Sequence, residues 1–212
     1  YSDANSNGDD YVYIAIRRPD GYVGKPAEAG TDAFAMDAGA GSSTIPNFDS
    51  GFPVDFAFEK TIAGGNSWST GARLIQGRYL YTDTNMAEGA WNKMVFDSNT
   101  GWNNHSSYGS GDQSWMWKRG AGFDVQTYTG KSVNGARSHS MGIAPEMMWV
   151  KRRDATSNWA VYHKDLHQYP QDYYLILNES LAAVNASQWW KPPTNTHWFT
   201  AIGGLNNVNG AS

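Results

Sequence analysis

Asp55 and Glu59 are the acidic pair whose spacing in this sequence comes nearest to a catalytic arrangement. Glycoside hydrolases use two carboxylates that lie about 5 to 9.5 Å apart on either side of the bond they cleave. Both side chains fall on one face of a predicted strand, but four residues along a strand span about 13 Å. Glycan hydrolysis is therefore our third hypothesis for the function, and we expect the chain not to be an enzyme.

Histidine and serine side chains offer no second route to catalysis. His163 and His167 have the four-residue spacing of two zinc ligands on a helix, but residues 159–162 have the pattern of a strand and no third ligand follows nearby. Ser138 and His139 are adjacent, without the strand, sharp turn and helix that expose a nucleophilic serine. We predict neither a zinc site nor nucleophilic catalysis.

An N-terminal loop has some features of a calcium site. Asp3, Asn5 and Asn7 place oxygen-bearing side chains at alternate positions before Gly8, as calcium-binding loops do. The twelfth position of such a loop needs a bidentate carboxylate, and Ile14 stands there. Calcium bound by Asp3, Asn5 and Asn7 is one interpretation, and a solvated turn is the other.

Tryptophan side chains are the best candidates for binding, because an aromatic face can stack on the apolar face of a sugar ring. Trp68 and Trp159 recur at one position of an internal repeat, which is more typical of core residues. Adjacent residues on an extended chain face opposite ways, so one of the Trp189–Trp190 pair is expected at the surface or in a subunit contact. The predicted glycan-binding residues are Trp102, Trp189, Trp190 and Trp198.

The elements that must position these residues are predicted to be strands. Short runs rich in β-branched and aromatic residues alternate with turn clusters, and helical periodicity is nearly absent. Short helical turns are expected at residues 84–91 and 178–189, where Thr or Asn precedes small and apolar residues. The predicted fold class is therefore all-β. The strongest strand predictions are residues 11–16, 54–58, 115–117 and 147–150.

An internal repeat organises the chain. Residues 51–60 align with residues 142–151 at a shift of 91, and the alignment keeps its phase beyond them with one insertion of four residues. We therefore predict two tandem antiparallel β-sandwich units, jelly-roll or lectin-like, with at most short helical turns. The first unit is assigned to residues 1–110 and the second to residues 111–212.

The phase of the repeat near the two ends leads to a further expectation. Asn7-Gly8 resembles Asn209-Gly210, which stands 202 residues later, or about two periods. We therefore expect the chain to be a segment of a longer array. Two interpretations of the duplication stay open: it builds a larger β-structure without functional meaning, or it multiplies weak binding on a surface.

Composition excludes several classes of partner and cofactor. With 40% hydrophobic and 17% charged residues, the chain lies far from the composition of disordered proteins. A formal net charge of −4 offers no basic surface to nucleic acid, and no apolar run approaches the about 20 residues of a membrane span. Because there is no cysteine, disulfides and thiol-based sites are excluded, and calcium is the one cofactor left open.

The second copy contains a run, GIAPEMMWVKRR, that begins a resemblance to a known family. The residues that carry it are 142–153, 158–164, 174–178 and 193–199, with weaker counterparts at 14–21 and 50–56. In this order they resemble a tandem repeat domain of unknown function found in tail-fibre-like and other virion structural proteins of marine bacteriophages. The resemblance implies a structural or host-recognition role and supplies no catalytic residues.

Our leading hypothesis is a non-enzymatic bacteriophage virion structural protein, a tail-fibre or surface-appendage module that binds host-surface polysaccharide. The alternative is a cellular extracellular adhesin or lectin. The expected location is therefore a virion or an extracellular surface. Fibres are symmetric assemblies, and the repeat pattern leaves a strand unfinished, so we expect homo-oligomers or association with other virion proteins.

Overall fold

The computed structural model describes residues 29–105, 107, 109–130, 135–186 and 190–200. Regular structure in this part consists of strands and of short 3-10 turns, so the predicted all-β class is confirmed. The strands form several antiparallel sheets. The 3-10 turns are η1 (Gly30–Asp32), η2 (Arg73–Ile75) and η3 (Pro170–Asp172).

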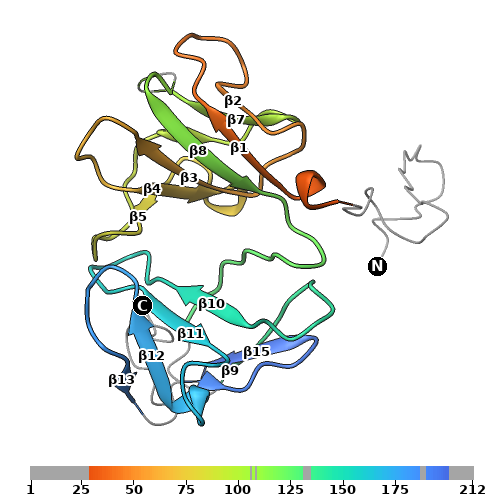
Figure 1. Cartoon of the computed structure of the whole chain (residues 1–212), viewed down its shortest axis with the longest axis vertical. Coiled ribbons are helices and arrows are strands. Elements are labelled where there is room, and N and C mark those ends of the chain that lie inside the picture. Colours follow the sequence, from red (N-terminus) through yellow and green to blue (C-terminus); the bar gives the residue numbers. More distant parts are fainter. Residues whose placement is uncertain (1–28, 106, 108, 131–134, 187–189, 201–212) are drawn as a thin grey trace, which may run out of the picture.

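Two antiparallel sheets form the first half of the molecule, which is the upper group of strands in Figure 1. Their strands are β1 (Phe34–Ala38), β2 (Phe48–Asp49), β3 (Phe56–Thr61), β4 (Ser69–Ala72), β5 (Leu80–Tyr81), β6 (Met94–Val95), β7 (Gly101–Asn104) and β8 (Asp112–Trp117). A five-stranded sheet has the order β1-β8-β3-β4-β5, and a three-stranded sheet has the order β2-β7-β6.

A shared apolar core joins these two sheets. Alternate residues of a strand face the same side, and in this way β3 and β8 bury Ala57 and Met116 completely. The other sheet contributes Phe48 and Trp102, whose rings stack with their centroids 4.6 Å apart. Removing these side chains from water is the main force that holds the sheets together. The buried cluster comprises Phe48, Phe52, Val54, Ala57, Met94, Phe96, Trp102 and Met116.

The second half also contains two antiparallel sheets, in the lower group of Figure 1. Its strands are β9 (Gly135–Ser138), β10 (Met147–Val150), β11 (Ala160–His163), β12 (Tyr173–Ile176), β13 (Val184–Asn185), β14 (Trp190–Lys191) and β15 (His197–Thr200). The sheet orders are β10-β11-β12-β13 and β14-β15-β9. Buried side chains from both sheets form one cluster, which contains Val150, Ala160, Tyr162 and Trp198.

Apolar and polar contacts join the two halves. Trp159 of the second half belongs to one buried cluster with Leu80 of the first, and its Nε1 donates to the carbonyl oxygen of Tyr81 at 2.7 Å. Nearby, Arg153 Nε lies 2.7 Å from Glu88 Oε2. The halves therefore pack directly on one another.

The strands predicted from the sequence are confirmed to different extents. The strand predicted at residues 147–150 is confirmed as β10, whereas the strand predicted at residues 54–58 begins only at Phe56. The strand predicted at residues 115–117 is the end of β8. The strand predicted at residues 11–16 lies outside the described residues.

Both predictions of helical turns were wrong for the residues that the structure describes. Residues 84–91 contain no helix, because Glu88 N donates to the Arg153 carbonyl oxygen at 2.8 Å and Gly89 pairs with Tyr79. In the described part of 178–189, β13 pairs with β12 instead. Contacts with distant residues thus override the weak local preference for a helix.

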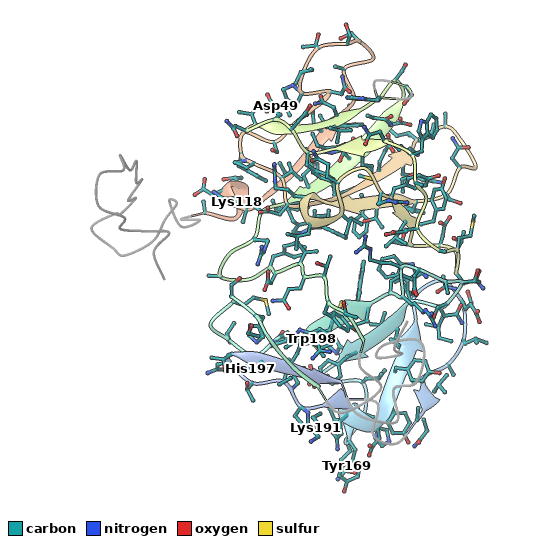
Figure 2. All side chains as sticks on the ribbon, turned by 180° about the vertical axis from the view of Figure 1, so that it is seen from behind. Asp49, Lys118, Tyr169, Lys191, His197 and Trp198 are labelled. Atoms are coloured by element: carbon teal, nitrogen blue, oxygen red, sulfur yellow. The ribbon has the colours of Figure 1, made fainter. Side chains whose placement is uncertain are left out.

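The expected boundary between residues 110 and 111 falls directly before β8. This strand lies between β1 and β3, so that Trp117 is paired with both Phe34 and Phe56. The chain leaves for the second half only after β8, near Lys118, which Figure 2 labels. A central strand of the first sheet is therefore supplied by residues assigned to the second unit.

Candidate functional site

An aromatic face covers the side of the five-stranded sheet opposite its core. Trp117 alternates with the core residue Met116 along β8 and so projects to this face. Its ring centroid lies 5.0 Å from that of Phe34, 5.9 Å from that of Phe56 and 5.3 Å from that of Phe58. Rings at these separations pack favourably on one another and form a continuous surface.

A cavity of about 690 Å³ lies where this aromatic face meets the second half. Phe58 and Trp149 meet beside it, with their ring centroids 5.7 Å apart. A mainly apolar lining suits an apolar guest or a chain segment better than a charged metabolite. This inter-half cavity is lined by Phe56, Trp117, Phe123, Met148, Trp149 and Trp198, among others.

The charged residues that line the inter-half cavity already have partners. Burial lowers the pKa of Lys151 to about 8 against the opposing effect of Asp154, and its Nζ donates to the Arg152 carbonyl oxygen at 2.5 Å. Asp124 Oδ1 lies 2.7 Å from Arg119 Nε. Recognition in this cavity must therefore rest mainly on apolar contact.

A second part of the aromatic face is open to solvent. Trp68 is 38% exposed, and its ring centroid lies 5.1 Å from that of Trp115 at an interplanar angle of 36°. Met36, which pairs with Trp115 in the sheet, is also exposed. Two adjacent indoles with an exposed flank can stack on consecutive sugar rings. The sequence pattern placed Trp68 in the core together with Trp159, and only Trp159 is buried.

Two of the four residues predicted to bind glycans, Trp102 and Trp198, have described side chains, and these lie in the cores of different halves. Trp102 is fully buried and its Nε1 donates to Ser114 Oγ at 2.9 Å, so it has no surface on which a sugar could stack. Trp198, labelled in Figure 2, is buried in the second half and lines the inter-half cavity. The backbone of Trp190 lies in β14, whereas Trp189 lies outside the described residues.

The candidate metal ligands give no cluster in the part of the chain that is described. Asp3, Asn5 and Asn7 lie outside it. Within it, no group of three or more His, Asp or Glu side chains is placed to hold a metal ion. His167 stacks on Tyr173 instead, with ring centroids 3.9 Å apart.

Asp55 and Glu59 are occupied by different partners. Asp55 Oδ1 lies 3.6 Å from Arg73 Nε. Glu59 is buried on the core side of β3, where Asn104 Nδ2 donates to Oε1 and Lys93 Nζ lies 3.3 Å from Oε2. Burial raises the pKa of Glu59 to about 7, with Lys93 lowering it and Asp112 raising it further. Glu59 does not line the inter-half cavity.

Comparison with known proteins identifies one family. The family described as Domain of unknown function (DUF7483) matches residues 81–212, which is more than half of the chain. This confirms the resemblance to a domain of unknown function, while its occurrence in virion proteins stays a prediction. No curated protein and no solved structure matches the chain. Among the described residues, no helix is long and apolar enough to cross a membrane.

Proposed function

The chain belongs to the DUF7483 family of domains of unknown function, and from that premise we propose that it is a non-enzymatic structural module of a bacteriophage virion. Its place would be a tail fibre or another surface appendage. The module consists of two tandem β-sandwich units, and its exposed aromatic surface binds glycans of the host.

The observation that carries this proposal is the recurrence of one strand-pairing pattern. β3 pairs with β4, and 91 residues further along the chain β10 pairs with β11. The order β2-β7-β6 in the first half has its counterpart in the order β9-β15-β14 in the second. Extended biological structures are commonly built by stacking such similar units.

The two-sheet clusters support the assignment of a sandwich to each unit. In the first half Met116 and Trp102 come from different sheets and share one buried cluster. In the second half Tyr162 and Trp198 do the same. Two antiparallel sheets joined by one apolar core are the defining arrangement of a sandwich.

The exposed pair Trp68 and Trp115 supports the glycan-binding part of the proposal. Stacking on a sugar needs an accessible aromatic face that is held rigidly. Trp115 is fixed by its place in β8, between β1 and β3, and Trp68 N donates to Asp83 Oδ1 at 3.2 Å. The backbones of both residues are therefore held in place, and the two indoles contact one another.

Mass spectrometry and immunolabelling of purified virus particles from the source of this sequence test the virion role. We expect the chain in intact particles, labelled by antibodies at an appendage. Its absence from particles, with expression in uninfected cells, would refute the virion role and favour the alternative of a cellular adhesin or lectin.

A host-polysaccharide array tests the glycan-binding part separately. We expect Trp68→Ala and Trp115→Ala to weaken binding at least tenfold, since the stacking surface is lost. Trp91→Ala is the matched control, because Trp91 is 61% exposed and stacks on no ring among the described residues. Equal losses in all three variants would show that this surface has no specific role.

A further inference from the structure

The outer edge of β10 carries backbone groups that no described strand pairs with. β10 is hydrogen-bonded to β11 on one side and ends its sheet on the other. Lys164 N donates to the carbonyl oxygen of Glu146 at 2.9 Å. Hydrogen-bonded pairs alternate along an antiparallel ladder, so the N–H and C=O groups of Met147 and Trp149 point away from β11.

The equivalent edge in the first half is paired. Met147 and Trp149 stand 91 residues after Phe56 and Phe58 of β3. Those two residues are paired with Trp117 and Trp115 of β8. The first half thus contains a strand beside β3 that the described second half lacks beside β10.

The inter-half cavity lies where this strand would run. In the first half β8 separates β3 from β1. A shift of 91 residues takes β1 to residues 125–129, and the cavity is lined by Val125 and Thr127 as well as by all four residues of β10. The lining therefore includes the counterparts of both β1 and β3, the two strands between which β8 lies in the first half.

We propose that this cavity binds a β-strand formed by residues 11–16 of a second copy of this chain. The inference rests on the tandem units of the proposed function. Residues 11–16 stand 101 residues before β8, and the match continues beyond the strand. β8 is followed by Lys118, Arg119 and, three residues later, Gly122, and residues 11–16 are followed by Arg17, Arg18 and Gly21.

The position of β8 in the chain identifies the second copy as the source. β8 completes the half that precedes it, and the chain then enters the following half. Residues 11–16 precede the first half, so by the same rule they complete a half that comes before it. In a solution of this 212-residue chain, a half that can accept residues 11–16 in this way is offered by another molecule, and the contact joins molecules head to tail.

The side chains of the segment match both walls of the cavity. A strand beside β10 has Val150 and Trp198 on one side and Trp149 with Phe58 on the other. A strand covered on both faces needs an uninterrupted apolar run. Residues 11–16 read YVYIAI and supply one.

The charge at one end of the segment also matches in this register. In the first half Phe56 pairs with Trp117. Met147 stands 91 residues after Phe56, and Ile16 stands 101 residues before Trp117, so the equivalent pair is Met147 with Ile16. Continued outward by one residue, this register places Arg17 opposite Glu146, whose carboxylate lies at the exposed start of β10. Opposite charges at facing positions stabilise a strand pair, and like charges destabilise it.

Engineered disulfides test the register and the source of the strand. The chain has no cysteine, so any bridge must join the introduced residues. Facing residues of an antiparallel pair have Cα atoms about 5.5 Å apart, within the range of a disulfide. We expect a mixture of Ile16→Cys and Met147→Cys molecules to form a covalent heterodimer under mild oxidation. Ala15→Cys with Met147→Cys is the control, because Ala15 projects to the other face.

Each outcome of this experiment decides one point. A bridge in the mixture supports the proposal. A chain that carries both Ile16→Cys and Met147→Cys is tested beside the mixture. If only this double variant forms a bridge, and forms it within one chain, the second copy is overturned as the source of the strand. If neither sample forms a bridge, the proposed strand itself is overturned. These results do not depend on the virion role, so a failure here leaves the particle experiment informative, and the reverse also holds.

Charge reversal tests the same contact without cysteines. Arg17→Glu alone is expected to weaken self-association by up to about fivefold, measured by sedimentation as a function of concentration. Combining it with Glu146→Arg should restore the association. Additive losses, or a wild-type chain that stays monomeric at high concentration, would overturn the proposed contact.

Discussion

Replacing Glu59 by Gln should remove a large part of the pH dependence of stability. The carboxyl group is buried beside Lys93, Asn104 and Asp112, and its pKa rises from 4.5 to about 7 in the folded chain. The folded state therefore holds the proton more tightly than the unfolded state does. The stabilisation from Glu59 is fully present below pH 4.5 and is lost as the pH rises through 7.

The magnitude follows from the two pKa values. One pH unit of difference corresponds to about 1.4 kcal/mol, so the contribution of Glu59 falls by about 3 kcal/mol between pH 4.5 and pH 8. Gln cannot ionise and lacks this dependence. Relative to the Glu59→Gln variant, the wild-type chain should thus become less stable by this amount as the pH rises.

Urea unfolding followed by tryptophan fluorescence, at several pH values in that range, measures this difference. Glu179→Gln is a suitable control, since Glu179 is exposed and its replacement removes one carboxylate without a buried partner. The reasoning would be refuted if the free energies of unfolding of the wild type and of the Glu59→Gln variant differed by the same amount at every pH. Such a result would mean that the Lys93 ion pair outweighs the cost of burial.

Three further substitutions test the core and the contact between the halves. Trp102→Ala should lower the free energy of unfolding by about 3 to 5 kcal/mol, measured by urea titration, because its ring stacks on Phe48 in the core. Gly101→Ala should cost about 1 to 3 kcal/mol in the same assay, because the new Cβ would overlap the Phe48 carbonyl oxygen. Arg153→Ala should cost at most about 1 kcal/mol, and less at high salt, since its ion pair with Glu88 is partly exposed; a large, salt-independent loss would contradict this.

The sequence predicted the strands best where apolar residues form a dense run. β10 and the end of β8 read MMWV and WMW, and their short length, aromatic content and flanking turn residues favour strands over helices. The segment at residues 84–91 was misjudged because Glu88 is hydrogen-bonded to Arg153, far along the chain, and Gly89 pairs with Tyr79, which lies outside the segment. Patterns within one segment do not contain that information.

Trp102 illustrates why the predicted binding residues were harder to place. It directly follows the turn cluster of residues 98–101, and the two residues after it are Asn103 and Asn104, which are polar residues typical of loops. Both asparagines are nevertheless buried, since Asn103 Oδ1 accepts from Asn47 N and Asn104 Nδ2 donates to Glu59. Buried amides are tolerated when they are hydrogen-bonded, and these partners lie more than 40 residues away in the sequence.

The placement of β8 also affects how the chain would bear mechanical load. Tension that draws the second half away from the first enters β8 at its last residue, Trp117, where the strand is paired with β1 and β3 together. The β1–β8 and β3–β8 ladders share that force, so pulling β8 out of the sheet must break the hydrogen bonds of both. Resistance to pulling is governed by the unfolding barrier rather than by equilibrium stability. A strand paired on both sides is therefore well suited to transmit force from one half of the molecule to the other.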